Sequence, residues 1–257
     1  MNTQNWSELL QRAVTEPGAI SSAYSTFHEY SMGNAMLAMF QCAARDIPLG
    51  PIGTFMHWKA LGRNVRKGER AIQLCMPVTG KRTDKNAETG EETEHGYTRF
   101  VFRNNWFVLA QTDGAEYVPA PIPEWDETRA LCALNVEKVA FAETNGNVQG
   151  YALHRTVAVS PVAALPYKTL FHELGHVVLG HTSEGQLSDG EERTARDIRE
   201  LEAESVAMLC CESLGLAGAE FSRGYIQSWF HGAEVPERSA QRIFKAADEI
   251  LKAGRPV

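Results

Sequence analysis

A His-Glu-x-x-His run, Phe171-His172-Glu173-Leu174-Gly175-His176, lies in an apolar, helix-compatible part of the chain. Four residues of α-helix turn through about 400°, so His172 and His176 lie one above the other on one face. Their imidazoles can converge on one metal ion, and Zn²⁺ suits two imidazoles, a carboxylate and a water. Glu173 adjoins that point and can act as general base when water attacks a carbonyl. We therefore predict one Zn²⁺ per chain, with Glu173 as catalytic base.

The residues around this run predict a buried helix. Pro166 suits a first helical turn, Gly180 is placed to end the helix, and the residues between are largely apolar. The alternative is a helix that carries hydrogen-bonded core histidines. His181 lies nine residues after His172, about 180° around such a helix, so we interpret it as a polar helix-end residue and not as a fourth ligand.

A third ligand is expected downstream of the two histidines. One class of zinc hydrolase uses a histidine six residues after the second, but that position is Thr182. The other arrangement takes a glutamate from a second helix, which we predict over residues 198–214. Glu200 and Glu204 share a face of that helix, so Glu200 can bind the metal while Glu204 accepts the free N–H of a ligating histidine. Glu202 points to the opposite side; a solvated, salt-bridged helix face remains the alternative for these acids.

The composition is that of a soluble globular protein, with 257 residues, 44% hydrophobic and 22% charged. That length holds one large or two ordinary domains. We find no signal segment and no apolar run near the ~18 residues of a membrane span, which predicts a cytoplasmic location without a membrane partner. Five cysteines without a Cys-x-x-Cys pair indicate neither a disulfide framework nor a thiolate zinc site.

Charge is unevenly spread along the chain. Residues 1–115 carry a net charge of +1 and residues 116–257 a net charge of −8, while residues 59–82 hold seven basic residues against one acid. Aromatic and basic residues interleave in Phe55-Met56-His57-Trp58-Lys59 and in Arg99-Phe100-Val101-Phe102-Arg103, so bases of a single strand can stack on rings while Lys and Arg contact phosphates. Core aromatics beside an ordinary wet surface are the alternative. The candidate DNA-binding residues are Phe55, Trp58, Lys59, Arg63, Arg66, Lys67, Arg70 and Arg103.

Periodicity and turn residues predict the other elements. Helices are expected over residues 6–16, 31–44, 54–61, 126–134, 221–230 and 237–253, and strands over 71–78, 97–103, 106–110, 139–143 and within 149–160. Residues 80–96 are interpreted as a hairpin loop and Asn145-Gly146-Asn147 as a turn. A strand layer before the His-Glu-x-x-His helix would offer an edge to an extended peptide.

This pattern predicts an α+β protein of two domains. Residues 1–115 are expected to form a domain of helices and antiparallel sheet, which carries the candidate DNA-binding residues. Residues 116–123 form a linker, since alternating prolines keep it extended. Residues 124–257 hold the metal site.

The chain resembles ArdC-type antirestriction proteins over nearly its whole length. The N-terminal half carries Ser31-Met32-Gly33-Asn34-Ala35-Met36, Gly53-Thr54-Phe55-Met56-His57-Trp58, Gly62-Arg63-Asn64-Val65-Arg66-Lys67-Gly68-Glu69 and Val108-Leu109-Ala110-Gln111-Thr112. The C-terminal half carries residues 172–176, 200–204 and 225–229 in the order found in that family. The resemblance implies an N-terminal domain that binds single-stranded DNA and a C-terminal zincin-like metallopeptidase domain. It also implies a plasmid- or phage-borne protein that shields incoming DNA from host restriction.

Two departures from the family pattern stand out. Glu202 occupies a position that is often apolar in the family, which adds a carboxylate that competes with Glu200 as ligand. The acidic segment 88–94 weakens the local basic field.

Two functions of different class remain open. In the first, the protein is a DNA-binding antirestriction factor with a metallopeptidase-type zinc site. In the second, it is a zinc metalloprotease whose N-terminal half recruits a host protein substrate. A purely structural zinc site needs a fourth ligand and no general base, so Glu173 favours working chemistry.

Overall fold

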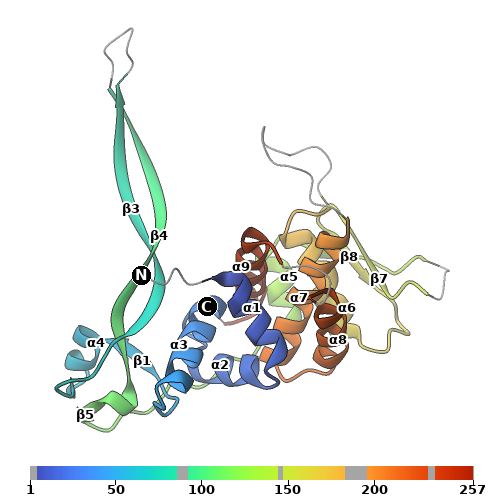
Figure 1. Ribbon diagram of the computed structural model, residues 1–257. Coiled ribbons are helices and arrows are strands. Elements are labelled where there is room, and N and C mark those ends of the chain that lie inside the picture. Colours follow the sequence, from blue (N-terminus) through green and yellow to red (C-terminus); the bar gives the residue numbers. More distant parts are fainter. Residues whose placement is uncertain (1–4, 86–91, 144–146, 183–195, 231–234, 257) are drawn as a thin grey trace. The chain divides into compact units, whose positions relative to one another are not determined.

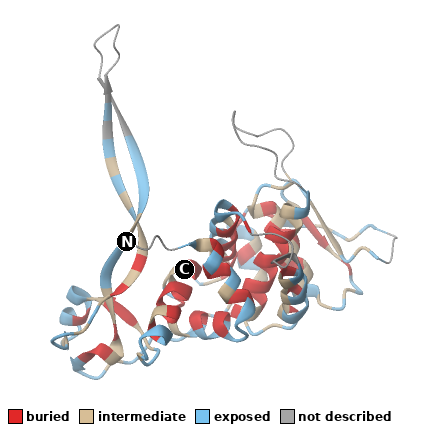
Figure 2. Ribbon diagram, viewed as in Figure 1, coloured by how far each residue is buried: buried red, intermediate tan, exposed pale blue. Residues whose placement is uncertain are grey.

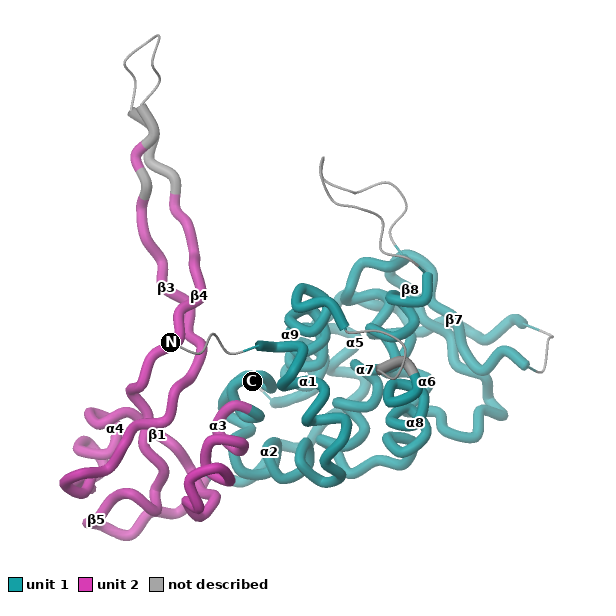
Figure 3. The backbone as a smooth tube through the Cα atoms, viewed as in Figure 1, with its two compact units in different colours: residues 1–36, 120–257 teal, residues 37–119 magenta. Residues whose placement is uncertain are grey.

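The computed structural model describes residues 5–85, 92–143, 147–182, 196–230 and 235–256. Helices and strands both occur, and the chain divides into two compact units (Figure 3). Unit 1 comprises residues 1–36 and 120–257, and unit 2 comprises residues 37–119. The α+β class predicted from the sequence is confirmed.

Unit 1 is mostly helical (Figure 1). Helix α7 is its centre, because every residue from Leu201 to Cys211 is buried. It packs against α2, α6, α8 and α9, and buried residues occur along all of these helices (Figure 2). The helices of this unit are α1 (Trp6–Thr15), α2 (Ala19–Phe27), α5 (Glu127–Ala133), α6 (Pro166–Val178), α7 (Arg196–Ser213), α8 (Ala219–Phe230) and α9 (Glu237–Ala253); α3 (Met32–Ala44) begins here.

A small sheet lies beside α6 in unit 1. Its order is β6 (Glu137–Lys138), β8 (Thr156–Val159), β7 (Gly150–Leu153), with β6 parallel and β7 antiparallel to β8. Helix α6 packs on β7 and β8. The strand predicted over residues 139–143 is wrong, because the strand found here is β6, at Glu137–Lys138. The Val139 amide still donates to the Val157 carbonyl of β8, and residues 140–143 contain no strand. The predicted turn at 145–147 falls largely outside the described residues.

Unit 2 is built on a long β-hairpin. Strand β3 (Ile72–Lys85) pairs antiparallel with β4 (Glu92–Val108), and the short β1 (Ile52–Thr54) adds to the other side of β4. A second pair joins β2 (Arg63–Val65) to β5 (Thr112–Gly114). Helix α4 (Phe55–Ala60), the 3₁₀ turn η1 (Leu109–Gln111) and the rest of α3 complete the unit.

The hairpin is longer than the sequence predicted. Residues 80–96 were expected to be a loop, but residues 80–85 and 92–96 continue the ladder, and residues 106–108 belong to β4 and not to a third strand. Residues 97–100 are all exposed, so this ribbon has solvent on both faces and needs no apolar alternation. Residues 86–91 of the predicted loop lie outside the described residues.

Residues 5–36 pack within unit 1, whereas the sequence predicted them in a domain over residues 1–115. Leu10, Val14 and Ile20 are fully buried there. Polar contacts also tie this segment to unit 1, among them the Met32 amide on Asp248 and the Arg223 guanidinium on the Val14 carbonyl. The reason is that α1 and the unpredicted α2 carry apolar faces, which α7, α8 and α9 cover. Residues 116–123 contain no helix or strand, and the boundary between the two units falls within them, after Pro119.

Candidate metal centre

Helix α6 presents the His-Glu-x-x-His run to α7. Pro166 occupies its first turn, and Leu170, Phe171 and Leu174 anchor its apolar side in the core. A Cβ added at Gly175 would lie 3.2 Å from the Ala203 Cα atom. Glycine therefore lets the two helix backbones approach closely, which brings side chains of α7 within reach of both histidines.

The structure brings His172, His176 and Glu200 together. The two Nε2 atoms lie 3.1 Å apart, and Glu200 Oε2 lies 3.4 Å from His172 Nε2 and 3.7 Å from His176 Nε2. Two ligand atoms about 2.0–2.1 Å from a tetrahedral metal are about 3.4 Å from each other. The three donor atoms therefore fit a single divalent cation, and an imidazole-carboxylate set suits Zn²⁺.

The side of the His172 ring that faces away from the donor cluster contacts the Glu204 carboxylate. Its Nδ1 atom lies 2.9 Å from Glu204 Oε2, and Lys168 Nζ contacts the other oxygen of Glu204 at 2.7 Å. Burial opposes the charge of Glu204, but the hydrogen bonds from His172 and Lys168 lower its pKa to about 2. Glu204 thus stays ionised and accepts the His172 Nδ1–H, which leaves Nε2 free for a metal. This is the arrangement predicted from the helix face.

His176 has a longer chain of partners that sequence reasoning missed. Its Nδ1 atom lies 3.0 Å from His181 Nδ1, and His181 Nε2 lies 2.8 Å from Glu202 Oε2. His181 is therefore more than the polar helix-end residue expected from the sequence. Glu202 is fully buried and points away from the donor cluster, so the expectation that it competes with Glu200 is wrong.

The two histidines differ strongly in pKa when no cation is bound. Burial opposes the charged form of His172, but hydrogen bonds to Glu200 and Glu204 outweigh burial and raise its pKa to about 9. Burial and the nearby charge of His172 lower the pKa of His176 to about 4. One imidazole therefore carries a proton at neutral pH, and a metal must displace that proton to bind.

Glu173 is buried next to the three donors. Burial is the main cause that raises its pKa to about 7, and the charge of Glu200 adds to it against the opposing charges of His172 and Lys168. A Cβ added at Gly150 would lie 3.1 Å from Glu173 Oε1, so strand β7 passes directly beside this carboxylate. A pKa near neutrality is suited to a general base, although a cation at the donors would lower it.

The predicted DNA-binding residues do not all lie at the surface of unit 2. Trp58 is fully buried; its indole N–H donates to the Phe107 carbonyl at 2.8 Å and its ring packs against Tyr117. It cannot stack on a base, so that assignment is wrong. The physical reason is that α4 turns Phe55 outward, with an exposed fraction of 49%, and Trp58 inward.

Two of the predicted arginines hold unit 2 together. The Arg63 guanidinium bonds to Thr112 and to the Gly114 and Ala115 carbonyls. Arg66 pairs with Glu69 at 2.8 Å. Lys59, Lys67, Arg70 and Arg103 are exposed, and their side chains have no ion pair with the described residues.

The hairpin adds exposed aromatic residues that were not assigned to DNA binding. Phe100 is 73% exposed and Tyr97 is 45% exposed. The interleaved segment Arg99-Phe100-Val101-Phe102-Arg103 was the signal in the sequence that could have identified Phe100.

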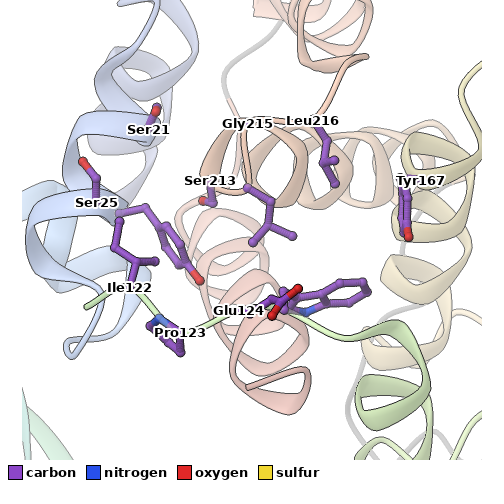
Figure 4. A pocket seen from close by; sticks show the side chains of 12 residues that line it. Ser21, Ser25, Ile122, Pro123, Glu124, Tyr167, Ser213, Gly215 and Leu216 are labelled. Carbon is purple, nitrogen blue, oxygen red and sulfur yellow. The ribbon is translucent and has the colours of Figure 1, made fainter. Parts of the chain in front are cut away.

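A groove of about 490 Å³ lies elsewhere in unit 1 (Figure 4). Helix α2, residues 122–125, the first turn of α6 and the end of α7 line it, and Trp125 and Tyr167 form part of its wall. None of the three donor residues lines it, so the groove and the metal centre are separate features.

Residues 2–107 match the family described as the N-terminal domain of anti-restriction factor ArdC. This segment is therefore similar to the ArdC N-terminal domain. The crystal structure of the antirestriction ArdC protein from the R388 plasmid, in metal-free form, shares the fold with a TM-score of 0.53, 23% identity, and 97% of this chain and 94% of that chain covered. Its Mn(II)-bound structure gives a TM-score of 0.52, 21% identity and 98% of both chains. The resemblance to ArdC seen in the sequence is confirmed.

A relative in Sinorhizobium fredii (strain NBRC 101917 / NGR234), named uncharacterized protein y4eC, is 27% identical over 256 residues, which covers 92% of this chain and 79% of the relative. No helix in the described part of the chain is long and apolar enough to cross a membrane.

Proposed function

We propose that this protein is an antirestriction factor that binds single-stranded DNA through unit 2 and holds a catalytic divalent metal in unit 1. The observation that carries the proposal is the match of residues 2–107 to the ArdC N-terminal domain. The donor cluster of His172, His176 and Glu200 supports the metal-dependent part.

The surface of unit 2 supports single-strand binding. On β4, Tyr97, Arg99 and Arg103 share one face of the hairpin, because alternate residues of a strand point the same way. Phe100 projects from the opposite face. Phe55, Lys59 and Lys67 add exposed aromatic and basic groups on α4 and the loop after β2. Rings that stack on bases beside cations that contact phosphates give sequence-tolerant binding of single strands.

The metal centre supports hydrolysis of a carbonyl compound. A divalent cation at the donors would act as a Lewis acid, and Zn²⁺ is the ion we propose, at one per chain. In this proposal Glu173 would accept a proton from the attacking water, and Glu204 accepts the hydrogen bond from His172 Nδ1–H. The fold relative was crystallised with Mn(II), so metal identity belongs among the quantities to be measured.

A specific observation favours a second candidate function, a metallopeptidase that cleaves a host protein. Strand β7 is an edge of its sheet and passes beside Glu173. An extended peptide could add to that edge by main-chain hydrogen bonds and bring its carbonyl groups to the metal centre. In this alternative, unit 2 recruits the protein substrate instead of coating DNA.

The test is DNA affinity, metal content and protection on one set of variants. A chain with Lys67→Glu, Arg70→Glu and Arg103→Glu should lose affinity for single strands of all sequences and keep its metal, since these residues belong to unit 2 and the donors to unit 1. Lys245→Glu, an exposed position on α9, is the matched control for a change of charge. Protection of unmodified DNA during transfer into a restricting host should fall with affinity. Unchanged affinity in the triple variant would place the DNA site elsewhere.

A further inference from the structure

After helix α6 ends, the chain turns back so that His181 contacts His176 of the same helix. Gly180 has a φ of 76°, a left-handed conformation that glycine adopts readily. The Gly180 amide donates to the Val177 carbonyl at 3.1 Å and the His181 amide donates to the His176 carbonyl at 2.9 Å. These two bonds form a Schellman motif, in which the second residue after the helix cap contacts the third residue before it.

That contact is ordinarily apolar, but here it joins two imidazoles. His181 Nδ1 lies 3.0 Å from His176 Nδ1, and the rings meet edge to face with centroids 5.2 Å apart. The turn at Gly180 therefore places a hydrogen-bonding group on the side of His176 that faces away from the donor cluster.

A single arrangement of protons satisfies this chain of groups. When His176 offers its Nε2 lone pair to a metal, its proton is on Nδ1 and is donated to His181 Nδ1. The proton of His181 is then on Nε2 and is donated to Glu202 Oε2, 2.8 Å away. Two neutral imidazoles and one carboxylate are thus consistent with metal binding, and the opposite order of protons would turn the His176 N–H toward the metal.

Glu202, the last group in this series of hydrogen bonds, is also contacted by a residue of a third helix. The Glu202 side chain is fully buried and His181 is 5% exposed. Arg242 of α9 lies 3.7 Å from Glu202 Oε2 and donates to the Leu179 carbonyl at 2.6 Å. Helices α6, α7 and α9 therefore meet at this carboxylate. A buried carboxylate is costly without partners, and the contacts with His181 and Arg242 supply them here.

We propose that His181 and Glu202 are positioning residues that orient His176 and set the affinity of the metal centre. They act through His176, and neither of them is one of the three metal-donor residues. His172 receives the same support from Glu204 by one direct bond, so each imidazole has its own carboxylate. This inference rests on the metal site of the proposed function. It adds that the affinity of the site also depends on Glu202, which acts on His176 through His181 at the end of α6.

The test is the dissociation constant for Zn²⁺ of purified full-length protein, measured by competition with a chelating dye. The decisive variant is His181→Phe with Glu202→Leu, because it restores an apolar Schellman contact and leaves no unpaired buried carboxylate. We expect it to fold and to bind Zn²⁺ about 10- to 100-fold more weakly, the usual cost of losing an outer partner of a metal ligand. Thr182→Ala, next to His181, is the matched control and should bind as the unchanged protein does.

Two further measurements separate positioning from a packing role. Glu202→Gln keeps an acceptor oxygen for His181, so its loss of affinity should be smaller than that of the double variant. Nitrogen NMR should show the His176 proton on Nδ1 in the unchanged zinc-loaded protein and a broadened or shifted signal in the double variant. A folded double variant with Zn²⁺ affinity within twofold of the unchanged protein would overturn the inference. Failure of the unchanged protein to bind any divalent metal would instead contradict the proposed function.

Discussion

His172 Nδ1 lies 2.9 Å from Glu204 Oε2, and Lys168 Nζ lies 2.7 Å from the other oxygen of the same carboxylate. Glu204 thus links the His172 imidazole to a cation one helical turn earlier on α6. We predict that Glu204→Ala weakens Zn²⁺ binding about 10- to 100-fold, because His172 loses the acceptor that fixes its tautomer. Chelator competition measures the change, and Lys168→Met, which removes only the outer cation, should show a smaller loss.

Glu200, and not Glu202, is predicted to be the carboxylate ligand. Elemental analysis of purified His172→Ala and Glu200→Ala should show loss of the metal that the unchanged protein carries at about one per chain. Glu202→Gln should retain it. Metal retained in Glu200→Ala but lost in Glu202→Gln would reverse the assignment.

Glu173→Gln separates the two functional classes. The change keeps side-chain size and leaves the three donors alone, so metal and DNA binding should persist while any hydrolysis falls by about 10² to 10⁴-fold. If this variant still protects unmodified DNA in a restricting host, protection arises from DNA binding. If protection disappears while DNA affinity is normal, proteolysis is part of the mechanism.

Metal affinity should depend steeply on pH. The pKa of His172 is raised to about 9 in the metal-free site, so at lower pH a metal must displace a proton from it. The apparent affinity should therefore fall as pH falls, by up to about tenfold per pH unit below 9. An imidazole with an ordinary pKa near 6.5 would leave affinity almost flat between pH 7.5 and 8.5. Titrations with a chelating dye at those two values distinguish the cases.

Phe100 and Trp58 should respond in opposite ways to alanine substitution. Phe100→Ala removes an exposed ring, so stability should be nearly unchanged while single-strand binding weakens by about 1–3 kcal/mol if the ring stacks on a base. Trp58→Ala empties a buried position and should destabilise unit 2 by about 3–5 kcal/mol. Thermal unfolding and DNA titration of both variants provide the comparison. Normal DNA affinity in Phe100→Ala would exclude this face of the hairpin from the binding site.

The elements with strong local signals were predicted closely. Helix α9 begins and ends where its apolar periodicity does, and α6 begins at Pro166. Helix α2 was missed because Pro17-Gly18 suggested a stop and its nine residues form a short pattern. The hairpin was predicted too short because polarity was taken as a loop signal, whereas a ribbon with solvent on both sides is stabilised by its main-chain ladder whatever its side chains are.

Local periodicity alone brought His172, Glu173 and His176 to one place, because the turn of an α-helix fixes which side chains share a face. The same rule put Glu200 and Glu204 together and Glu202 opposite. Tertiary structure decided the contacts between helices, which depend on where the helices cross. The close approach at Gly175 brought Glu200 to the histidines, and the turn at Gly180 carried His181 back to His176, where Glu202 meets it. It also buried Trp58 and packed helices α1 and α2 into unit 1, because the partner of an apolar helix face depends on how the helices are arranged in the folded protein.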